Sequence, residues 1–294
     1  MGWRTLSIVG LTKSSYSEIH RKITLAIERG GGIDLDSDDS VIIKVNLCNF
    51  KTPDTGAVTH PIFLDSVLSY LGSLSKKLNI SIVESDATVS RPDKLIDWLG
   101  LRTIIAKHGV NWVNLTKDKL IKKRIRGRFF HEIEIPKIIE DSDYLITMAK
   151  LKTHTITKIS CCLKNQFGCI PYPKKNEFHR VLDDVIVDAC LAMKPDFCIV
   201  DGILGMGGVK GPDLGIPIKS NAVVTGKDPV SVDSVCAKIM GFNPYFIGHL
   251  RKAEKAGVGQ ISSKIVGEEI AQIKKDFEFN HLYACIIRQI LSWK

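Results

Sequence analysis

The part of this chain richest in reactive side chains is residues 147–168, TMAKLKTHTITKISCCLKNQFG. It follows an apolar segment, Tyr144 to Met148, that predicts a buried strand. Within it stand Lys150, Lys152, His154, Lys164 and Asn165. Desolvating several cations is costly, so this cluster favours a site where an anionic ligand neutralises them. The plainer interpretation is a solvated loop of ordinary cations.

Alternation along an extended segment would point Lys150, Lys152 and His154 the same way. They would then form a three-point anion clamp, with His154 as a proton donor. Lys164 and Asn165 fall on a predicted short helix that ends at Gly168, from which they could reach the same ligand. A helix surface could also hold both without any function.

Further polar residues follow other predicted strands. They are Lys44, Asn46, Glu84, Asp86, Asp201, Lys227 and Asp228. In open α/β sheets ligands bind outside the carboxyl ends of the strands, where the loops converge. The sequence therefore predicts a polar cleft at that edge of the sheet.

Two of these residues have competing interpretations. Burial of Lys44 in VIIKVN would lower its pKa and suit it to acid, base or nucleophilic work. Alternatively, Lys44 is a strand-end lysine paired with a carboxylate such as Glu84. Asp228 precedes a predicted helix, so it is either a cap or a member of the site.

Taken together, the candidate catalytic residues are Lys44, Lys152 and His154. The candidate substrate-binding residues are Asn46, Glu84, Lys150, Lys164, Asn165, Asp201 and Asp228. In this scheme the lysines hold the anion, the asparagines orient the substrate, and Glu84 or Asp201 tunes a lysine. His60 and His179 lack a metal-binding spacing, so we predict no metal ligands.

Strand and helix patterns alternate, which predicts an α/β fold with a mostly parallel sheet flanked by helices. The predicted strands are residues 6–9, 40–45, 79–83, 144–148, 197–200 and 222–225, and the predicted helices are 15–28, 61–74, 181–193 and 229–240. A C-terminal helix is expected over 282–293. We expect a single α/β domain over 1–294, or two lobes over about 1–145 and 146–260 with a helical tail over 261–294.

Two segments interrupt this pattern. Residues 119–126 and 129–135 predict a basic β-hairpin insertion, whose cations and Phe129 and Phe130 could bind RNA. A solvated face is the commoner use of such a run. The glycine-rich residues 202–215 match no nucleotide-binding fingerprint, and predict either a flap over the cleft or a surface loop.

Composition limits the partners and the cellular location that we expect for the protein. The net charge of +9 over 294 residues favours acidic partners, and 44% hydrophobic residues are ordinary for a globular protein. The eight cysteines show no C-x-x-C and no ferredoxin-like spacing. No apolar run approaches the ~20 residues that cross a bilayer. We therefore expect a cytoplasmic protein without a transmembrane segment.

The same motifs resemble the family catalogued as domain of unknown function 362, over roughly residues 40–260. The resemblance is carried by Lys44-Val45-Asn46, Thr59-His60-Pro61, the K-x-K-x-H residues 150–154, Lys164-Asn165 before Phe167-Gly168, His179, Asp201-Gly202, and Gly226 with Asp228-Pro229-Val230 and Asp233. The family commonly has proline in place of Val45. The layout is also similar to that of nickel-pincer lactate racemases, whose two-lobed cleft carries lysines and histidines.

The resemblance implies redox chemistry, because many family members are associated with ferredoxin-type iron–sulfur modules. This chain has no such cysteine set, so a cluster would belong to a ferredoxin-like partner, and a small-molecule cofactor is the alternative. The leading hypothesis is an oxidoreductase-type enzyme acting on a small anionic metabolite. The alternatives are an RNA-binding or RNA-modifying accessory protein, and a redox or metal-cofactor assembly partner without catalysis.

Overall fold

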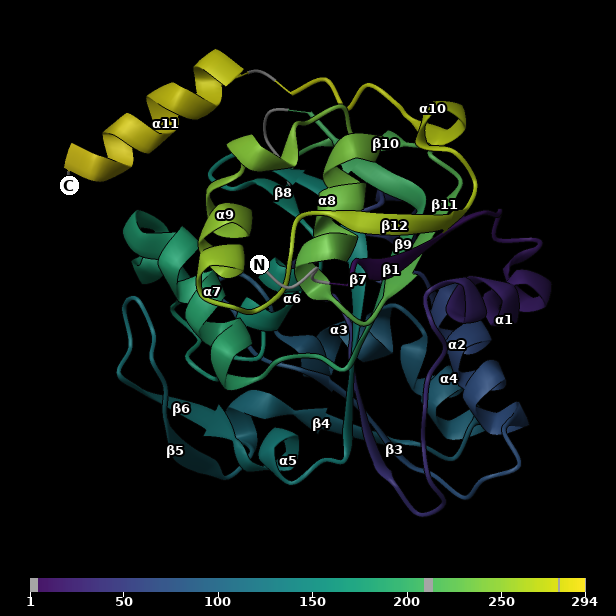
Figure 1. The fold of residues 1–294 in the computed structure, drawn as a ribbon. Helices are drawn as coiled ribbons and strands as arrows, with labels where there is room; N and C mark the ends of the chain where they lie inside the picture. Colours follow the sequence, from purple (N-terminus) through teal and green to yellow (C-terminus); the bar gives the residue numbers. More distant parts are fainter. Residues whose placement is uncertain (1–4, 209–213, 280, 294) are drawn as a thin grey trace.

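One mixed sheet organises the molecule and continues through both halves of the chain. The computed structural model describes residues 5–208, 214–279 and 281–293, and within them ten strands form this sheet. Its main path runs β12-β1-β11-β9-β7-β2-β3-β4, with β10 paired to β9 and β8 to β7 (Figure 1). The strands are β1 (Ser7–Lys13), β2 (Ser40–Lys44), β3 (Asn79–Glu84), β4 (Asn111–Asn114), β7 (Tyr144–His154), β8 (Lys158–Ser160), β9 (Phe197–Gly207), β10 (Ile216–Ile218), β11 (Ala222–Gly226) and β12 (Ser263–Gly267).

Helices cover both faces of the sheet. One layer is α1 (Ile19–Arg29), α2 (Pro61–Ser73), α3 (Pro92–Trp98) and α4 (Leu101–Lys107), and the other is α6 (Cys162–Phe167), α7 (Leu182–Ala192), α8 (Pro229–Ile239) and α9 (Gly248–Lys255). Strand alternation divides the core between them. In β2, Val41 and Ile43 pack with the first layer and Ile42 packs with the second. The α/β architecture predicted from the alternating patterns is thus confirmed.

The strand directions determine which loops can meet. From β9 to β4 all neighbouring strands are parallel, so β2, β3, β7 and β9 end at one edge. In contrast, β11 is antiparallel to both β1 and β9. The residues that follow β11, Asp228 among them, therefore lie at the opposite edge. Our placement of Asp228 with the other strand ends was wrong for this reason.

Strands β1, β7 and β9 continue well beyond their predicted ends, and β7 and β9 affect the site. Strand β7 continues to His154, so the K-x-K-x-H residues are strand and not loop. Strand β9 continues to Gly207, because its glycines let the backbone approach β7 closely. A Cβ on Gly205 would lie 2.5 Å from the carbonyl oxygen of Leu151. Residues 202–207 of the glycine-rich segment are therefore strand, and residues 209–213 lie outside the described part of the chain.

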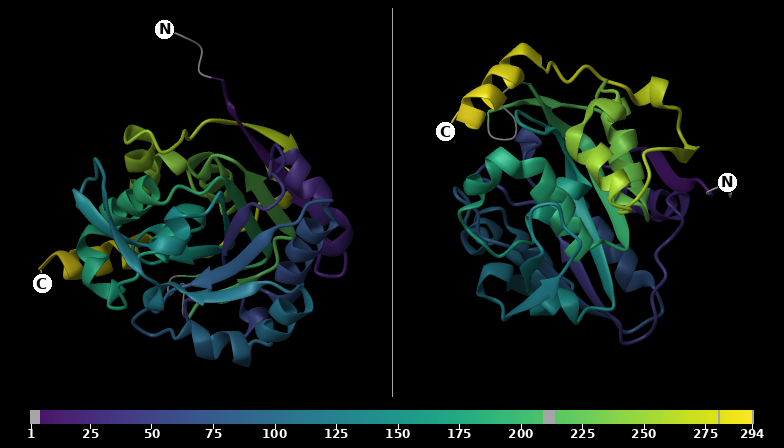
Figure 2. Two further views of the ribbon diagram at one scale, coloured as in Figure 1. Left: turned by 90° about the horizontal axis from the view of Figure 1, so that it is seen from below. Right: turned by 60° about the vertical axis from the view of Figure 1, so that its left-hand side comes forward.

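The predicted hairpin and C-terminal helix are both present. Strands β5 (Leu120–Arg124) and β6 (Glu132–Pro136) pair antiparallel as a separate two-stranded sheet, followed by the short α5 (Lys137–Glu140). After β12 and the short α10 (Ile270–Ile273), the chain ends in α11 (His281–Trp293). Helix α11 lies at the periphery in both views of Figure 2, beside the 3-10 helix η3 (Lys175–Val181). The remaining short 3-10 helices are η1 (Pro53–Thr55), η2 (Leu115–Lys117) and η4 (Pro244–Phe246).

Candidate functional site

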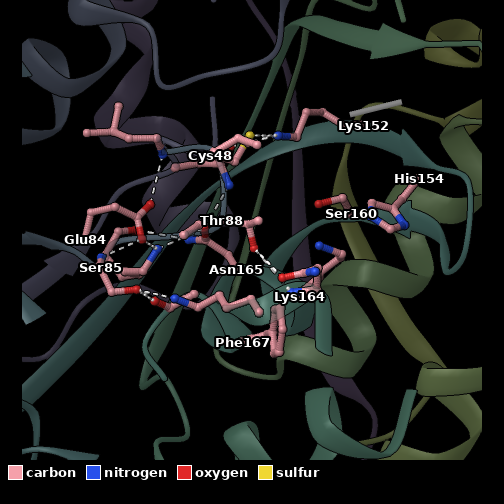
Figure 3. A pocket seen from close by; sticks show the side chains of 18 of the residues that line it. Cys48, Glu84, Ser85, Thr88, Lys152, His154, Ser160, Lys164, Asn165 and Phe167 are labelled. Atoms are coloured by element: carbon pink, nitrogen blue, oxygen red, sulfur yellow. Dashed lines mark hydrogen bonds and ion pairs between the residues drawn. The ribbon is translucent and has the colours of Figure 1, made fainter. Parts of the chain in front are cut away.

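A cavity of about 280 Å³ opens at the edge where the parallel strands end. Side chains from β2, β3, β7, α6 and η3, and from the loops that follow β2 and β3, surround it (Figure 3). Seven of the ten predicted site residues line it, namely Lys44, Asn46, Glu84, Lys152, His154, Lys164 and Asn165. The other three candidates and two further strand-end residues do not line the cavity. The candidates are Lys150, Asp201 and Asp228, and the strand-end residues are Asp86 and Lys227. Parallel strand direction explains why separate sequence segments meet here.

Lys44 is the centre of a buried polar network on one side of the cavity. Its Nζ lies 2.6 Å from Oε1 of Glu84 and donates to the carbonyl oxygen of Val45 at 2.8 Å. The Glu84 carboxylate also accepts from the backbone N–H of Leu47 and Ser85. Glu84 thereby fixes both the lysine and the backbone that follows β2 and β3. The predicted Lys44–Glu84 pair is present, while the proton-handling role of Lys44 stays a prediction.

Asn165 joins this network to the next strand. Its carboxamide nitrogen donates to Thr147 Oγ1 and the carbonyl of Lys44, and its oxygen accepts from Asn46 Nδ2 at 3.0 Å. Gly168 makes room for this packing, since a Cβ there would lie 2.8 Å from Lys44 Nζ. Asn165 has all its hydrogen-bonding atoms engaged, so we assign it to positioning Lys44 and Asn46.

Lys152 lies next in this chain of contacts and is 1% exposed. Its Nζ donates to Asn46 Oδ1 at 2.8 Å and to the carbonyl oxygen of Ala57 at 2.7 Å, with Cys48 Sγ at 3.2 Å. The oxygen atoms of Asn46 and Ala57 are uncharged, and the Cys48 sulfur is only weakly polar. Among the described residues no carboxylate lies within ion-pair distance of this amine. The positive charge of Lys152 is therefore buried against the cavity without a protein counter-ion.

His154 shows in its contacts which ring nitrogen carries the proton. Its Nδ1 accepts from the backbone N–H of Ile156 and Thr157 at 3.2 and 3.3 Å. Burial, together with the nearby cations Lys164 and Lys152, lowers the pKa of His154 well below its usual range. The ring is thus neutral with its proton on Nε2, which can only donate a hydrogen bond.

Lys150 belongs to a second buried cluster behind the cavity. Its Nζ lies 2.8 Å from Oδ2 of Asp201, its register partner on β9, and 3.3 Å from the Tyr16 hydroxyl. Tyr16 also donates to Asp201 and stacks on His60, with ring centroids 3.7 Å apart. Burial lowers the pKa of His60 to about 4 and raises that of Tyr16. Because Lys150 pairs with Asp201 and does not line the cavity, only Lys152 and His154 of the predicted three-point clamp border it.

Asp228 acts as a helix cap. Its Oδ1 accepts from the N–H groups of Val230 and Ser231 at the start of α8, and Oδ2 accepts from Ser7 and Gln260. Asp233, which belongs to the motif shared with the family, lies fully buried inside α8 and caps α6 by accepting from the N–H groups of Cys162 and Leu163. Asp233 thereby anchors the helix that carries Lys164 and Asn165.

Several lining residues escaped sequence reasoning. They are Cys48, Ser85, Thr88, Ser160, Lys175 and Asn176. Lys175 is 7% exposed, and its Nζ donates to Ser85 Oγ and to the carbonyl oxygen of Asp86, both at 2.7 Å. Burial, partly opposed by Glu84, lowers the pKa of Lys175 to about 8. No spacing marked this lysine, because it reaches the cavity from η3, far along the chain from the strand ends.

Several basic side chains of the hairpin segment form ion pairs with neighbouring carboxylates. Lys122 and Arg124 pair with Glu132, Lys123 pairs with Glu140, and Arg128 pairs with Asp184. These pairs leave less positive potential for a phosphate backbone than the sequence suggested. RNA binding by the hairpin stays a prediction.

Over residues 5–208, 214–279 and 281–293, no group of three or more His, Cys, Asp and Glu side chains is arranged to hold a metal ion. Likewise, none of the helices described has the length and apolar character needed to cross a membrane.

The fold and site together define an α/β protein with a lysine-rich cavity at the carboxyl edge of a mixed sheet. Residues 41–238 match the model of the family "Domain of unknown function (DUF362)". The chain therefore belongs to this family, as its motifs predicted.

Two further proteins are similar to the chain. "Thylakoid-associated protein sll1697" of Synechocystis is 27% identical over 143 residues, which are 46% of this chain and 44% of that protein. The chain thus spans less than half the length of this relative. The lactate racemase apoprotein of Thermoanaerobacterium thermosaccharolyticum matches with a TM-score of 0.45 and 12% identity, over 80% of this chain and 57% of that one.

Proposed function

We propose that this protein is an enzyme that acts on a small anionic metabolite bound in the cavity. The anionic group of the metabolite would lie against Lys152, Lys164 and the Nε2–H of His154. The observation that carries this proposal is Lys152, a buried ammonium group whose three contacts carry no negative charge.

Electrostatics explains why such a lysine points to a ligand. An ammonium group loses most of its hydration on burial, and the effective penalty is several kcal/mol. Amide and carbonyl oxygens offset part of it, whereas a carboxylate or phosphate in the adjoining cavity would offset far more. A neutral His154 that donates from Nε2 supports the same ligand without adding another charge to desolvate.

The remaining residues divide into supporting roles. Asn46 holds Lys152 through its oxygen and Asn165 holds Asn46, so the anion-binding groups are fixed before a ligand arrives. Such preorganisation reduces the free-energy cost of binding. Lys44, held by Glu84, is our candidate for proton transfer, and Asp201 neutralises Lys150 at the second cluster.

For the reaction class we propose oxidation or reduction of this metabolite. The support is the resemblance of this chain to a family in which many members are associated with iron–sulfur modules. Electrons would come from an external carrier such as a ferredoxin-like protein, since the eight cysteines of this chain are single free thiols. Free thiols also support a cytoplasmic location, where the environment is reducing.

Ligand-induced stabilisation tests the binding part of the proposal. Phosphate and oxalate should each raise the thermal unfolding midpoint of the wild-type protein in proportion to their concentration over Kd. The Lys152→Met variant should lose most of this shift. A Lys255→Met variant removes an exposed cation at the end of α9 and should keep it. Equal shifts for Lys152→Met and the wild type would contradict the proposal.

The redox part needs a separate measurement. Anaerobically prepared protein, mixed with a reduced ferredoxin and a panel of small oxo acids, should oxidise the ferredoxin only when the right acid is present. The absorbance of the ferredoxin reports its oxidation directly. No acid-dependent oxidation across such a panel would count against redox chemistry and leave the anion-binding cavity in place.

A further inference from the structure

The side of the cavity opposite the proposed anion site holds a lysine with different chemistry. Figure 3 places Glu84 and Ser85 at one side, and Lys152, His154 and Ser160 at the other. Lys175 Nζ donates to Ser85 Oγ at 2.7 Å, so its amine lies on the Ser85 side. A small ligand held by Lys152 and His154 would therefore extend toward Lys175.

Its contacts separate Lys175 from Lys44 and Lys152, two other lysines that line the cavity. Lys44 forms a 2.6 Å ion pair with Glu84, and Lys152 has three acceptors around its Nζ. Lys175 has two neutral acceptors, Ser85 Oγ and the Asp86 carbonyl, and among the described residues no carboxylate within ion-pair distance. An ammonium group with three protons and two acceptors has one position left on the nitrogen.

The surroundings of Lys175 favour a neutral amine. Its side chain is 7% exposed, and burial lowers its pKa to about 8. Glu84, Cys169 and Asp86 act against this shift, while Lys44 adds to it. At about pH 8 half of the Lys175 side chains would thus be unprotonated. A buried lysine of this kind is a competent nucleophile toward carbonyl carbon.

We infer that Lys175 forms an imine with the carbonyl group of an anionic aldehyde or ketone whose charged group is held by Lys152 and Lys164. This inference rests on the proposed function and narrows its substrate class to oxo acids and phosphorylated carbonyl compounds. It assigns the covalent role to Lys175, a residue that the sequence did not mark, whereas the sequence had suggested Lys44 as a possible nucleophile.

The step balances without an oxidant or a further reactant. The nitrogen lone pair attacks the carbonyl carbon, and the C=O π electrons move to oxygen. The C–N bond forms and the C–O bond then breaks. Starting from the ammonium form, two of its three protons leave with the oxygen as water, and the third remains on the imine nitrogen. Ser85, whose hydroxyl donates to the Gly168 carbonyl and accepts from Lys175, is the positioning residue for the amine.

Borohydride trapping tests the inference on the full chain. The wild-type protein is incubated at about pH 8 with succinic semialdehyde, whose carboxylate and aldehyde stand at opposite ends of a four-carbon chain, and is then reduced with sodium borohydride. Reduction converts an imine into a stable carboxypropyl-lysine, which peptide mass spectrometry locates. Butanal serves as the matched reagent without an anionic group. The neighbouring exposed Lys174 is the internal control for unselective modification.

We expect at least about tenfold more modification of Lys175 than of Lys174 by succinic semialdehyde, and much less of Lys175 by butanal. Lys175→Arg should abolish the adduct, whereas Lys174→Arg should not. Lys164→Met should remove the preference for succinic semialdehyde over butanal. If Lys175→Arg fails to fold, the peptide map of the wild type decides alone.

Two results would overturn the inference. One is equal modification of Lys175 and Lys174 by succinic semialdehyde. The other is equal modification of Lys175 by succinic semialdehyde and butanal, which would remove the anionic substrate class. Oxalate, which binds as an anion but forms no imine under these conditions, separates the two proposals. Thermal stabilisation by oxalate without selective modification of Lys175 would leave the proposed function standing and end this inference.

Discussion

Two lysines on β7 are equally buried but have opposite electrostatic surroundings. Lys150 and Lys152 are each 1% exposed. Lys150 is paired with the Asp201 carboxylate inside the protein, whereas Lys152 contacts only neutral partners and borders the cavity. The comparison teaches that burial of a lysine does not by itself mark a ligand site. What marks it is a buried positive charge whose counter-ion the protein does not supply.

The largest expected effect separates these two lysines by stability. Lys150→Met would leave the Asp201 carboxylate buried without its partner, and breaking a buried pair costs about 3–5 kcal/mol. Lys152→Met would leave only the neutral acceptors Asn46 Oδ1 and Ala57 O without a donor, which costs about 1–3 kcal/mol. It would also remove the desolvation penalty of an ammonium group that has no counter-ion, so its net loss of stability should be the smaller of the two. Urea unfolding of both variants measures the two losses.

The double variant Lys150→Met/Asp201→Leu provides the control. It removes both charges, so it should recover much of the stability that Lys150→Met loses. If Lys152→Met proves the more damaging of the two single changes, the division into a structural and a ligand-binding lysine is wrong.

A second prediction uses the pH dependence of stability. The pKa of Lys175 is lowered to about 8 by burial, against about 10.4 in an unfolded chain. Between these values the unfolded state binds more protons than the folded state, so stability rises with pH. This destabilisation, about 3 kcal/mol, is fully present below pH 8 and disappears as the pH approaches about 10.4.

Comparison with Lys175→Met isolates this effect. Urea unfolding of both proteins at several pH values from about 7 to about 10.4 should show the wild type gaining about 3 kcal/mol relative to the variant. Glu84, Lys44, Asp86 and Cys169 face Lys175 in both proteins, so their own titration largely cancels. A stability difference that does not change with pH would show that the Lys175 amine is not desolvated.

The smallest expected effect concerns Asp228, at the opposite edge of the sheet. Asp228→Ala removes the cap of α8 and should cost about 1 kcal/mol of stability. Because Asp228 lies outside the cavity, stabilisation by phosphate or oxalate should be unchanged. A loss of that stabilisation in Asp228→Ala would place the anion site elsewhere than in the cavity.

Much of the parallel part of the fold was predictable because its strands are short apolar runs bounded by turn residues. Ser40–Lys44 and Asn79–Glu84 have this form. The antiparallel direction of β11 was not predictable, since AVVTG reads the same either way along the sheet. That one direction decided whether Asp228 joined the site. The lysines inside β7 also concealed the length of this strand, because partners that offset their burial come from distant segments.

The candidate site was likewise predictable only in part. Lys152, His154 and Asn165 were predicted because they stand close together in the sequence and follow a strand. Lys175 and Ser85 were missed because neither has a motif around it, and their contact spans 90 positions. Lys150 was included for its spacing, and only the register pairing with Asp201 shows that its charge is used internally.

Helix α6 holds two neighbouring residues with different tasks, since Lys164 faces the cavity and Asn165 is bonded to Lys44, Asn46 and Thr147. Successive residues of a helix are about 100° apart around its axis. Adding or deleting a single residue between Cys162 and Asn165 would thus turn the carboxamide out of its network and bring a different side chain to the ligand. We therefore expect insertions and deletions to be excluded from this stretch throughout the family.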